Sequence, residues 1–410
     1  QSFGDPTGSG STSQLGVFAQ GEVNVTSKFL LRLGLRYDYE RPIDPFPSDS
    51  NNVSPRVSFS WGPTESLRIK GGYGRFYGIA AIGPMFAVQI QDGVRVRTTI
   101  RVLGVGPAAA SPTVPWNAFP DRRFPSEAAA GQGLYPPFLL KAGDYQSAHT
   151  DQYSFGLEYS LSNKLLVSLD GVNARGRNIL IARNINPITI PPGGRPDPRY
   201  SDVYLYESTG NSWYSAGTLG LVSRLGGPVE FTAYYTYAKS EDDYIDWLTE
   251  FQPQDPLNPA DERGPSVQSP DQKATVTGTF TTLHSGERRI GFTFSTIVDW
   301  RNGLHYNVLA GYDRNLNGDP LSDRPAGVRR NTGQLGSYFS LDLRASVSIP
   351  LGPDPMLELI AVCTNVTNND NVLQRNNVQN LAPGVPNPAF GSPTLYGAGR
   401  ILQLGAKFSF

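Results

Sequence analysis

The end of the chain alternates between apolar and polar positions. From Leu402 to Phe410 every second residue is apolar, and glutamine, glycine, lysine and serine fill the places between them. A period of two predicts a strand with one apolar and one polar face. An aromatic last residue on such a strand is typical of the final strand of an outer-membrane barrel, where Phe408 and Phe410 would serve as the assembly signal. A half-buried strand of a soluble sandwich has the same pattern. The recurrence of the pattern and the length of the strands therefore distinguish a barrel from a sandwich.

The pattern recurs along most of the chain. Examples are residues 31–39, 153–161 and 341–349, where leucine, tyrosine or other apolar residues alternate with polar, charged or glycine residues. Several runs reach ten residues or more, whereas strands of globular proteins usually stop at about five or six. A tilted strand that crosses a bilayer needs roughly nine to eleven residues. Strand length therefore favours a transmembrane barrel over a soluble sandwich.

About thirteen strands are predicted, and the connections between them alternate strictly between tight turns and long loops. Turns at one end and long loops at the other indicate a bacterial barrel, with turns in the periplasm and loops outside the cell. The fold class is all-β: one antiparallel up-and-down barrel domain over residues 1–410. The predicted strands are 13–25, 28–40, 54–61, 65–77, 151–162, 164–176, 212–225, 228–240, 271–283, 287–300, 338–350, 355–366 and 397–410. The long loops are 41–53, 78–150, 177–211, 241–270, 301–337 and 367–396.

Composition agrees with this fold class. No window holds the roughly eighteen consecutive apolar residues of a membrane helix. With 35 basic and 36 acidic residues, nothing indicates a nucleic-acid partner. The single cysteine, Cys363, excludes an intrachain disulfide and a cysteine-based metal cluster. Inward-facing Arg32, Arg36, Arg68, Lys70, Arg344 and Lys407 are expected to pair with acidic residues such as Asp38, Glu158, Asp342 and Glu358 in a lumen charge ladder.

An odd number of strands cannot close an antiparallel barrel, because the first and last would run in the same direction. The chain also begins at Gln1, with no methionine and no signal peptide. We therefore expect a C-terminal piece of a larger barrel, or a processed chain.

Several motifs, in order, resemble the barrel of TonB-dependent outer-membrane receptors of the Oar-like group. Residues 54–61 (SPRVSFSW) and 67–77 (LRIKGGYGRFY) are similar to one family hairpin, and 231–243 (FTAYYTYAKSEDD) to the end of a family strand. Residues 323–327 (DRPAG) and 338–344 (YFSLDLR) resemble a further pair of family motifs. Residues 365–368 (NVTN) stand where the family has NLFN. Each motif is weak alone, but the set covers residues from about 15 to the end.

The resemblance implies a Gram-negative outer-membrane receptor with a barrel of about 22 strands, plugged by an N-terminal domain and energised by the TonB complex. Its implied partners are outer-membrane lipid, TonB through the plug, and the barrel-assembly machinery through the C-terminal strand. The solute would be scarce and bulky, of the siderophore, oligosaccharide or peptide class. Here the plug, the TonB-contacting segment and about nine strands are missing. The alternative is a self-contained passive porin of about fourteen strands; an enzyme is disfavoured because no catalytic grouping can be assembled.

Aromatic residues predicted for the outer loops are the candidates for ligand contact, because aromatic rings stack on sugars and chelators. They also anchor in lipid headgroups, and Trp213 fits an interfacial girdle equally well. The candidates are Trp116, Tyr200, Tyr204, Tyr206, Trp213, Tyr244 and Trp247.

One loop carries side-chain oxygens at alternate positions followed by a glycine, as in the first half of a calcium loop. The position that needs the bidentate glutamate holds Arg324, which excludes an EF-hand. A polar turn is the favoured interpretation and a looser structural Ca²⁺ site is the alternative; no other cofactor is expected. Its candidate ligands are Asp313, Asn315, Asn317, Asp319 and Asp323.

Overall fold

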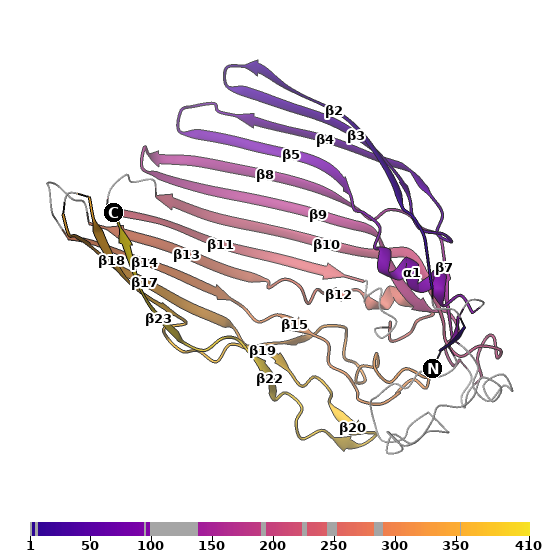
Figure 1. Cartoon of the computed structure of the whole chain (residues 1–410). Helices are drawn as coiled ribbons and strands as arrows, with labels where there is room; N and C mark the ends of the chain where they lie inside the picture. The colour runs from indigo at the N-terminus through magenta and orange to yellow at the C-terminus, as the bar shows by residue number, and fades with distance from the viewer. Residues whose placement is uncertain are drawn as a thin grey trace.

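The computed structural model describes residues 2–4, 7–93, 96–98, 138–189, 194–223, 228–243, 252–282, 290–352 and 354–410. Thirteen long strands of this part of the chain follow one another in one antiparallel meander, each hydrogen-bonded to the next (Figure 1). They are β2 (Ser13–Thr26), β3 (Phe29–Arg41), β4 (Asp49–Trp61), β5 (Leu67–Tyr77), β8 (His149–Ser162), β9 (Leu165–Asn184), β10 (Val203–Ser223), β11 (Val229–Asp242), β13 (Gln272–Thr281), β14 (Gly291–Arg301), β17 (Tyr338–Pro350), β18 (Met356–Thr364) and β23 (Ile401–Ser409). The predicted meander is confirmed.

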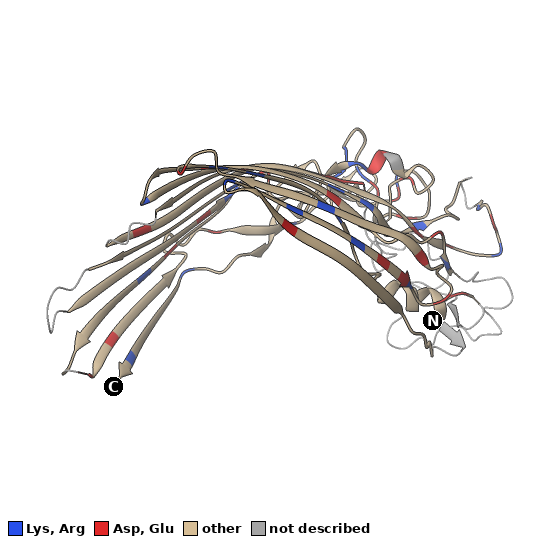
Figure 2. Cartoon of the chain, turned by 90° about the horizontal axis from the view of Figure 1, so that it is seen from above, with Lys and Arg blue, Asp and Glu red and all other residues tan. Residues whose placement is uncertain are grey.

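The sheet is open. Its path runs from β2 to β23, and these two edge strands are not paired with each other. As the first and thirteenth strands of an antiparallel meander they run in the same direction, so an antiparallel ladder cannot join them. Seen from above, the sheet is an arch (Figure 2).

Short turns gather at one end of the sheet and long connections at the other (Figure 1). Thr26 is followed closely by Phe29 and Ser162 by Leu165, whereas β5 and β8 are separated by residues 78–148. This sorting confirms the predicted topology. The short strand β1 (Ser2–Gly4) precedes β2 and pairs with β6. The long connections carry the other elements: α1 (Ile82–Ile90), β6 (Val96–Thr98), β7 (Leu139–Ala142), η3 (Pro259–Glu262), β12 (Gly264–Pro265), β15 (His305–Tyr306), β16 (Gly333–Gln334), β19 (Val372–Arg375), β20 (Asn380–Ala382), β21 (Val385–Pro386) and β22 (Pro393–Tyr396).

The predicted loop 177–211 is wrong at both ends. Strand β9 continues to Asn184 and β10 begins at Val203, and the two pair as far as Tyr204 with Asn184. The ladder passes irregularities around Gly210, and β7 adds a parallel strand to the start of β10. Because β9 and β10 stay paired well into the predicted loop, residues 177–184 and 203–211 belong to the sheet.

The ladder register divides the strands into two faces. Leu33 pairs with Val57, and Leu157 with Leu169, whereas Arg32 pairs with Ser58. We call the first set the lipid face and the second the lumenal face, because a membrane barrel is apolar outside and polar inside. The predicted outward positions agree: Leu33, Leu35 and Phe155 are exposed, and Leu157, Leu341 and Leu343, on the same face by register, are half-exposed.

Glycine in β5 permits close packing on both faces. A Cβ on Gly71 would lie 2.8 Å from the ring of Phe59, and one on Gly72 would lie 2.9 Å from the carbonyl oxygen of Val57. Both glycines therefore mark close approach of the neighbouring strand.

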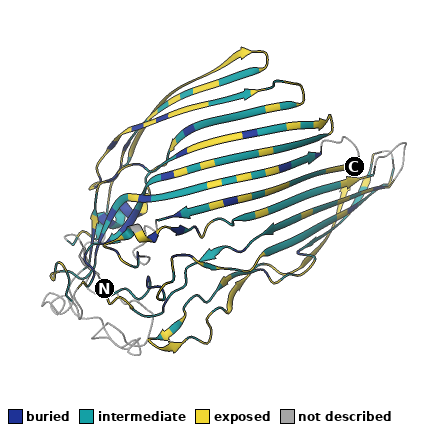
Figure 3. Ribbon diagram, turned by 180° about the vertical axis from the view of Figure 1, so that it is seen from behind, coloured by how far each residue is buried: buried dark blue, intermediate teal, exposed yellow. Residues whose placement is uncertain are grey.

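The largest cluster of buried apolar residues lies at the loop end, between loop 42–48, α1, β7 and the start of β10. It consists of Ile43, Phe46, Met85, Val88, Leu140, Tyr145, Ala182, Tyr204 and Tyr206. Figure 3 shows the buried segments gathered there, while the strands beyond are largely exposed or intermediate. Within the described residues, no helix has the length and apolarity that crossing a membrane demands.

Candidate functional site

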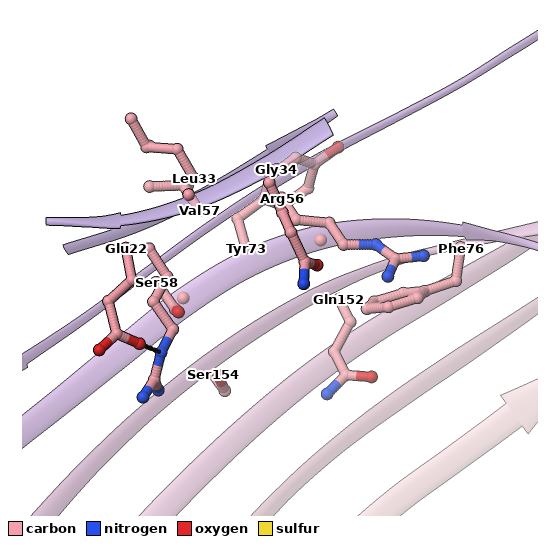
Figure 4. Close-up of a pocket in the computed structure, with 15 residues that line it drawn as sticks. Glu22, Leu33, Gly34, Arg56, Val57, Ser58, Tyr73, Phe76, Gln152 and Ser154 are labelled. Carbon is pink, nitrogen blue, oxygen red and sulfur yellow. Dashed lines mark hydrogen bonds and ion pairs between the residues drawn. The ribbon is translucent and has the colours of Figure 1, made fainter. Parts of the chain in front are cut away.

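The lumenal face carries a depression of about 480 Å³ over β2–β8. Gly34, Gly72 and Ser154 keep its floor low, because their side chains are absent or small. Arg56, Phe76 and Gln152 line it, while Leu33 and Val57 point away to the lipid face (Figure 4). The guanidinium of Arg56 lies 4.6 Å from the Phe76 ring centroid, a cation–π contact. This part of the wall can hold a polar or aromatic group.

A second depression of about 560 Å³ continues the first toward β9 and β10. Lys70 stands at its centre, with its ammonium 2.8 Å from Glu158 and 3.0 Å from Asp170. Arg36 likewise pairs with Asp38, and Arg344 with Glu358. The pairs of Lys70, Arg36 and Arg344 confirm the predicted lumen charge ladder in part, since Arg68 and Lys407 form no ion pair among the described residues. Arg32 also pairs with an acidic residue, Glu22 on β2 at 2.6 Å, which is not one of the partners named in the prediction.

A buried carboxylate organises the apolar cluster at the loop end. Glu40 accepts hydrogen bonds from the Tyr145 hydroxyl and the Ser147 hydroxyl at 2.9 Å each, and from the backbone N–H of Ala80 at 2.9 Å. Burial, with Glu40 alongside, raises the pKa of Tyr145 well above its usual range. The sequence analysis did not identify this network, since its members come from three segments without a common motif.

Two buried arginines connect the loops that follow β11 and β14. Arg324 makes a forked pair with Glu262, and Arg330 pairs with Asp242 at 2.6 Å. Arg330 also donates to the backbone oxygens of Asp242 and Glu262. The DRPAG motif thus has a structural role here, because its arginine fastens one long loop to another.

The aromatic candidates separate into four groups. Trp116, Tyr244 and Trp247 lie outside the described residues. Tyr200 is half-buried in a loop with the Arg199 guanidinium 5.5 Å from its ring centroid. The prediction that Tyr204 and Tyr206 lie in a loop is wrong: they are in β10 and buried in the apolar cluster. Trp213 is half-exposed on the lipid face of β10. Ligand contact by any of these residues stays a prediction.

The calcium candidates form a tightly turned loop. Backbone N–H groups of Asn317 and Gly318 donate to Asp313, that of Asp319 to Asn317, and that of Asn315 to Asp323. These bonds are typical of polar Asx turns. One oxygen of the fully buried Asp323, Oδ1, has no hydrogen-bond partner among the described residues. No group of three His, Cys, Asp or Glu residues in the described part is arranged to hold a metal ion. The Ca²⁺ site stays a prediction.

The C-terminal aromatics lie on an open sheet edge. Within the described part of the chain, strand β23 pairs with β18 alone, and Phe408 and Phe410 have ring centroids 6.0 Å apart. Both side chains are exposed. An edge strand with free backbone groups and two exposed rings is a surface that another chain can recognise by strand addition.

The chain belongs to the outer membrane beta barrel domain family, which matches residues 43–348. Together with the sheet and its apolar outer face, this makes it an outer-membrane protein of a Gram-negative bacterium. No curated protein matches the sequence.

Solved structures with the same fold include transporters and receptors of the outer membrane. The outer membrane transporter YddB from Escherichia coli is similar with a TM-score of 0.62 and 13% identity, over 97% of this chain and 45% of that chain. A mutant of the ferric enterobactin receptor from Pseudomonas aeruginosa is similar with a TM-score of 0.56 and 15% identity, over 97% of this chain and 45% of that chain. The siderophore receptor PiuA from Acinetobacter baumannii is similar with a TM-score of 0.54 and 14% identity, over 97% of this chain and 43% of that chain. The chain thus spans less than half the length of these proteins, and the likeness shows the fold.

Proposed function

We propose that this chain forms part of the barrel wall of a TonB-dependent outer-membrane receptor of the Oar-like group. The observation that carries the proposal is the open, odd-numbered meander, which overlaps 45% of a known outer-membrane transporter chain. Unpaired backbone groups on β2 and β23 cannot face hydrocarbon, since nothing there can hydrogen-bond them. Further strands would satisfy both edges and enlarge the barrel to the size that accommodates a plug.

The alternative is a passive porin of about fourteen strands. It is less well supported, because the thirteen strands of the described sheet cannot close antiparallel without a further strand between β2 and β23. The two edge strands, β2 and β23, lie on opposite sides of the sheet (Figure 1). An enzymatic role has less support still, since the similar structures named above are transporters and receptors.

In the proposed receptor the two halves of the wall have different tasks. The lumenal depressions, with their paired charges at Lys70 and Arg32, would contact the plug or a passing solute. The ion pairs of Arg324 and Arg330 would hold the outer loops in a fixed arrangement, so that a solute meets a preorganised mouth. Solutes of the siderophore, oligosaccharide or peptide class fit such a mouth by size and polarity, and the TonB complex would supply energy through the plug.

An uptake experiment distinguishes the receptor from the porin. The complete gene is deleted and restored in its host, and accumulation of labelled siderophores, oligosaccharides and peptides is measured with and without a protonophore. A receptor binds its solute in both conditions but accumulates it only with the proton gradient. Accumulation that follows the external concentration and ignores the protonophore would establish the porin instead.

A further inference from the structure

A row of charged and aromatic side chains crosses five strands on the lipid face, close to the loop end. Arg75, Asp151, Arg175, Trp213 and Glu241 are successive ladder partners on β5, β8, β9, β10 and β11. We call this row the charged rung. Neighbouring strands are about 4.8 Å apart, so the row extends for roughly 20 Å. Charges on this face need compensation, because a charged group in the hydrocarbon layer is costly.

The charged rung presents its basic groups outward and its acidic groups inward. Arg75 covers Asp151 at 2.8 Å, and the side chains are 31% and 9% exposed. Lys239 and Arg263 both pair with Glu241, which is 20% exposed against 72% and 52% for the two bases. Each carboxylate therefore lies beneath its cation, and the surface that meets the surroundings is positive.

Arg175 adds a charge that no carboxylate balances. Among the described residues it forms no ion pair, and its guanidinium lies 5.9 Å from the Trp213 ring centroid. Arg263 lies 4.1 Å from the same ring. On the next row toward the loops, the Nε of Arg177 is buried without a hydrogen-bond partner. Guanidinium groups beside an indole form a preorganised site for an anion, since each can donate two parallel hydrogen bonds.

The position of the rung matches the headgroup level of a membrane. The next row away from the loops holds Tyr73 and Tyr153, whose ring centroids are 4.8 Å apart, and the row after that holds Phe155 and Tyr237. Leu157, Leu169 and Leu219 follow. Aromatic girdles mark the boundary between hydrocarbon and headgroups. A charged row about 7 Å beyond such a girdle lies among headgroups.

A shallow depression of about 510 Å³ opens next to the rung on the same face. Gly171 and Gly217 form its floor, and a Cβ added at Gly217 would meet no atom within 4 Å. Aromatic side chains stand at its sides, and polar groups lie at the edge facing the rung. These are Tyr153, Phe155 and Tyr237 at the sides, and Asn173, Ser215 and Lys239 at the edge.

We propose that this depression and the charged rung together bind one phosphorylated lipid of the outer leaflet. Its phosphate would sit at Arg175 and Lys239, and its apolar part would lie over Gly217 between the aromatic rings. The lipid face meets lipid, and the positive surface selects an anionic headgroup. A glycine floor next to a cationic edge matches a molecule that is apolar at one end and anionic at the other.

The test uses the purified protein in phosphatidylcholine nanodiscs that contain a minor fraction of diphosphoryl lipid A, with bound lipid counted by native mass spectrometry. R175Q/K239Q should weaken retention of the lipid by about tenfold or more, the equivalent of at least one charge-assisted hydrogen bond. G217L should weaken it through bulk alone, with every charge in place. The unaltered protein should retain lipid A without phosphates only weakly. This retention should not exceed that of diphosphoryl lipid A by R175Q/K239Q.

Two matched controls keep the outcome clear. R56Q/R68Q removes two charges from the lumenal face, and G21L fills a similar glycine depression of the lipid face on β2, away from the rung. Both should retain lipid A like the unaltered protein, and all variants are checked for folding by heat-modifiable migration on gels. Equal retention by R175Q/K239Q, or equal loss in the lumenal control, would overturn the proposal. Displacement of the lipid by inorganic phosphate would overturn it too, and would identify a free-anion site.

Discussion

Arg324 donates through both terminal nitrogens to the two carboxylate oxygens of Glu262, at 2.8 Å each, across a sequence separation of 62 residues. The two side chains are 8% and 2% exposed. A forked arginine–carboxylate pair has a defined geometry, so it fixes both the distance and the orientation of its partners. Here it connects the DRPAG motif of one long loop to the 3₁₀-helix η3 of another, so these two loops are fixed to each other.

Glu262→Gln should destabilise the loop end strongly. It keeps the shape of the side chain but leaves the Arg324 cation buried without its counter-charge, a change that costs about 3–5 kcal/mol in proteins. Hydrogen exchange of the folded protein in vesicles should show faster exchange in residues 252–265 and 321–331. The control Arg199→Gln breaks an exposed pair with Asp197, and exchange should be unaffected. Unchanged exchange in Glu262→Gln would show that the pair does not hold the loops.

Tyr145 should give the loop end a pH dependence at alkaline pH. Its folded-state pKa is raised, so its contribution to stability is fully present below the ordinary tyrosine pKa of roughly 10 and is lost as the pH rises above it. Proteolysis at residues 78–93 and 138–148 should therefore accelerate above about pH 10. Tyr145→Phe should remove this acceleration above about pH 10. It should instead make proteolysis moderately faster than in the unaltered protein at every pH, because the hydrogen bond to Glu40 is lost. A step of equal size in Tyr145→Phe would assign the transition to another group.

Much of the sheet could be predicted from sequence because strand periodicity and turn lengths are local properties. The alternation at 341–349 places Leu343 and Arg344 on opposite faces, and the ladder agrees. The prediction failed between 177 and 211, where β9 and β10 continue as a ladder. This region pairs with β7 and packs on α1 in the apolar cluster, and no local sequence pattern encodes such contacts between distant segments.

The loop-end site could be predicted only in part. Tyr204 and Tyr206 lie in a segment whose sequence does not alternate like a strand, so the sequence predicts a loop for two residues that fill a core. Glu40 and Ser147 were missed, since their hydrogen bond joins residues that are 107 positions apart. Lumen pairs such as Arg36 with Asp38 were accessible from sequence, because two residues of one strand separated by one position share a face.

For the loop 313–323, a polar turn and a Ca²⁺ site predict opposite results when Ca²⁺ is added. Backbone N–H groups already use oxygens of Asp313, Asn317 and Asp323, so we expect titration calorimetry with Ca²⁺ to detect no binding in the micromolar range. Asp323→Asn should then loosen the loop to the same extent with Ca²⁺ and with a chelator. Protection by Ca²⁺ that disappears in Asp323→Asn would instead establish the metal site.

Leu343 tests the assignment of the lipid face. It lies in the middle of β17 between Thr296 of β14 and Cys363 of β18, on the face that carries Phe294 and Leu359. Leu343→Arg should lower the free energy of unfolding in lipid vesicles by about 2–4 kcal/mol, the cost of an arginine at the bilayer midplane. The control Ser348→Arg adds the same side chain on the lumenal face of the same strand, opposite Glu358, and should cost much less. Urea unfolding followed by tryptophan fluorescence measures both. Equal costs for the two variants would contradict the assignment, because a lumenal cation keeps its water and a lipid-facing one does not.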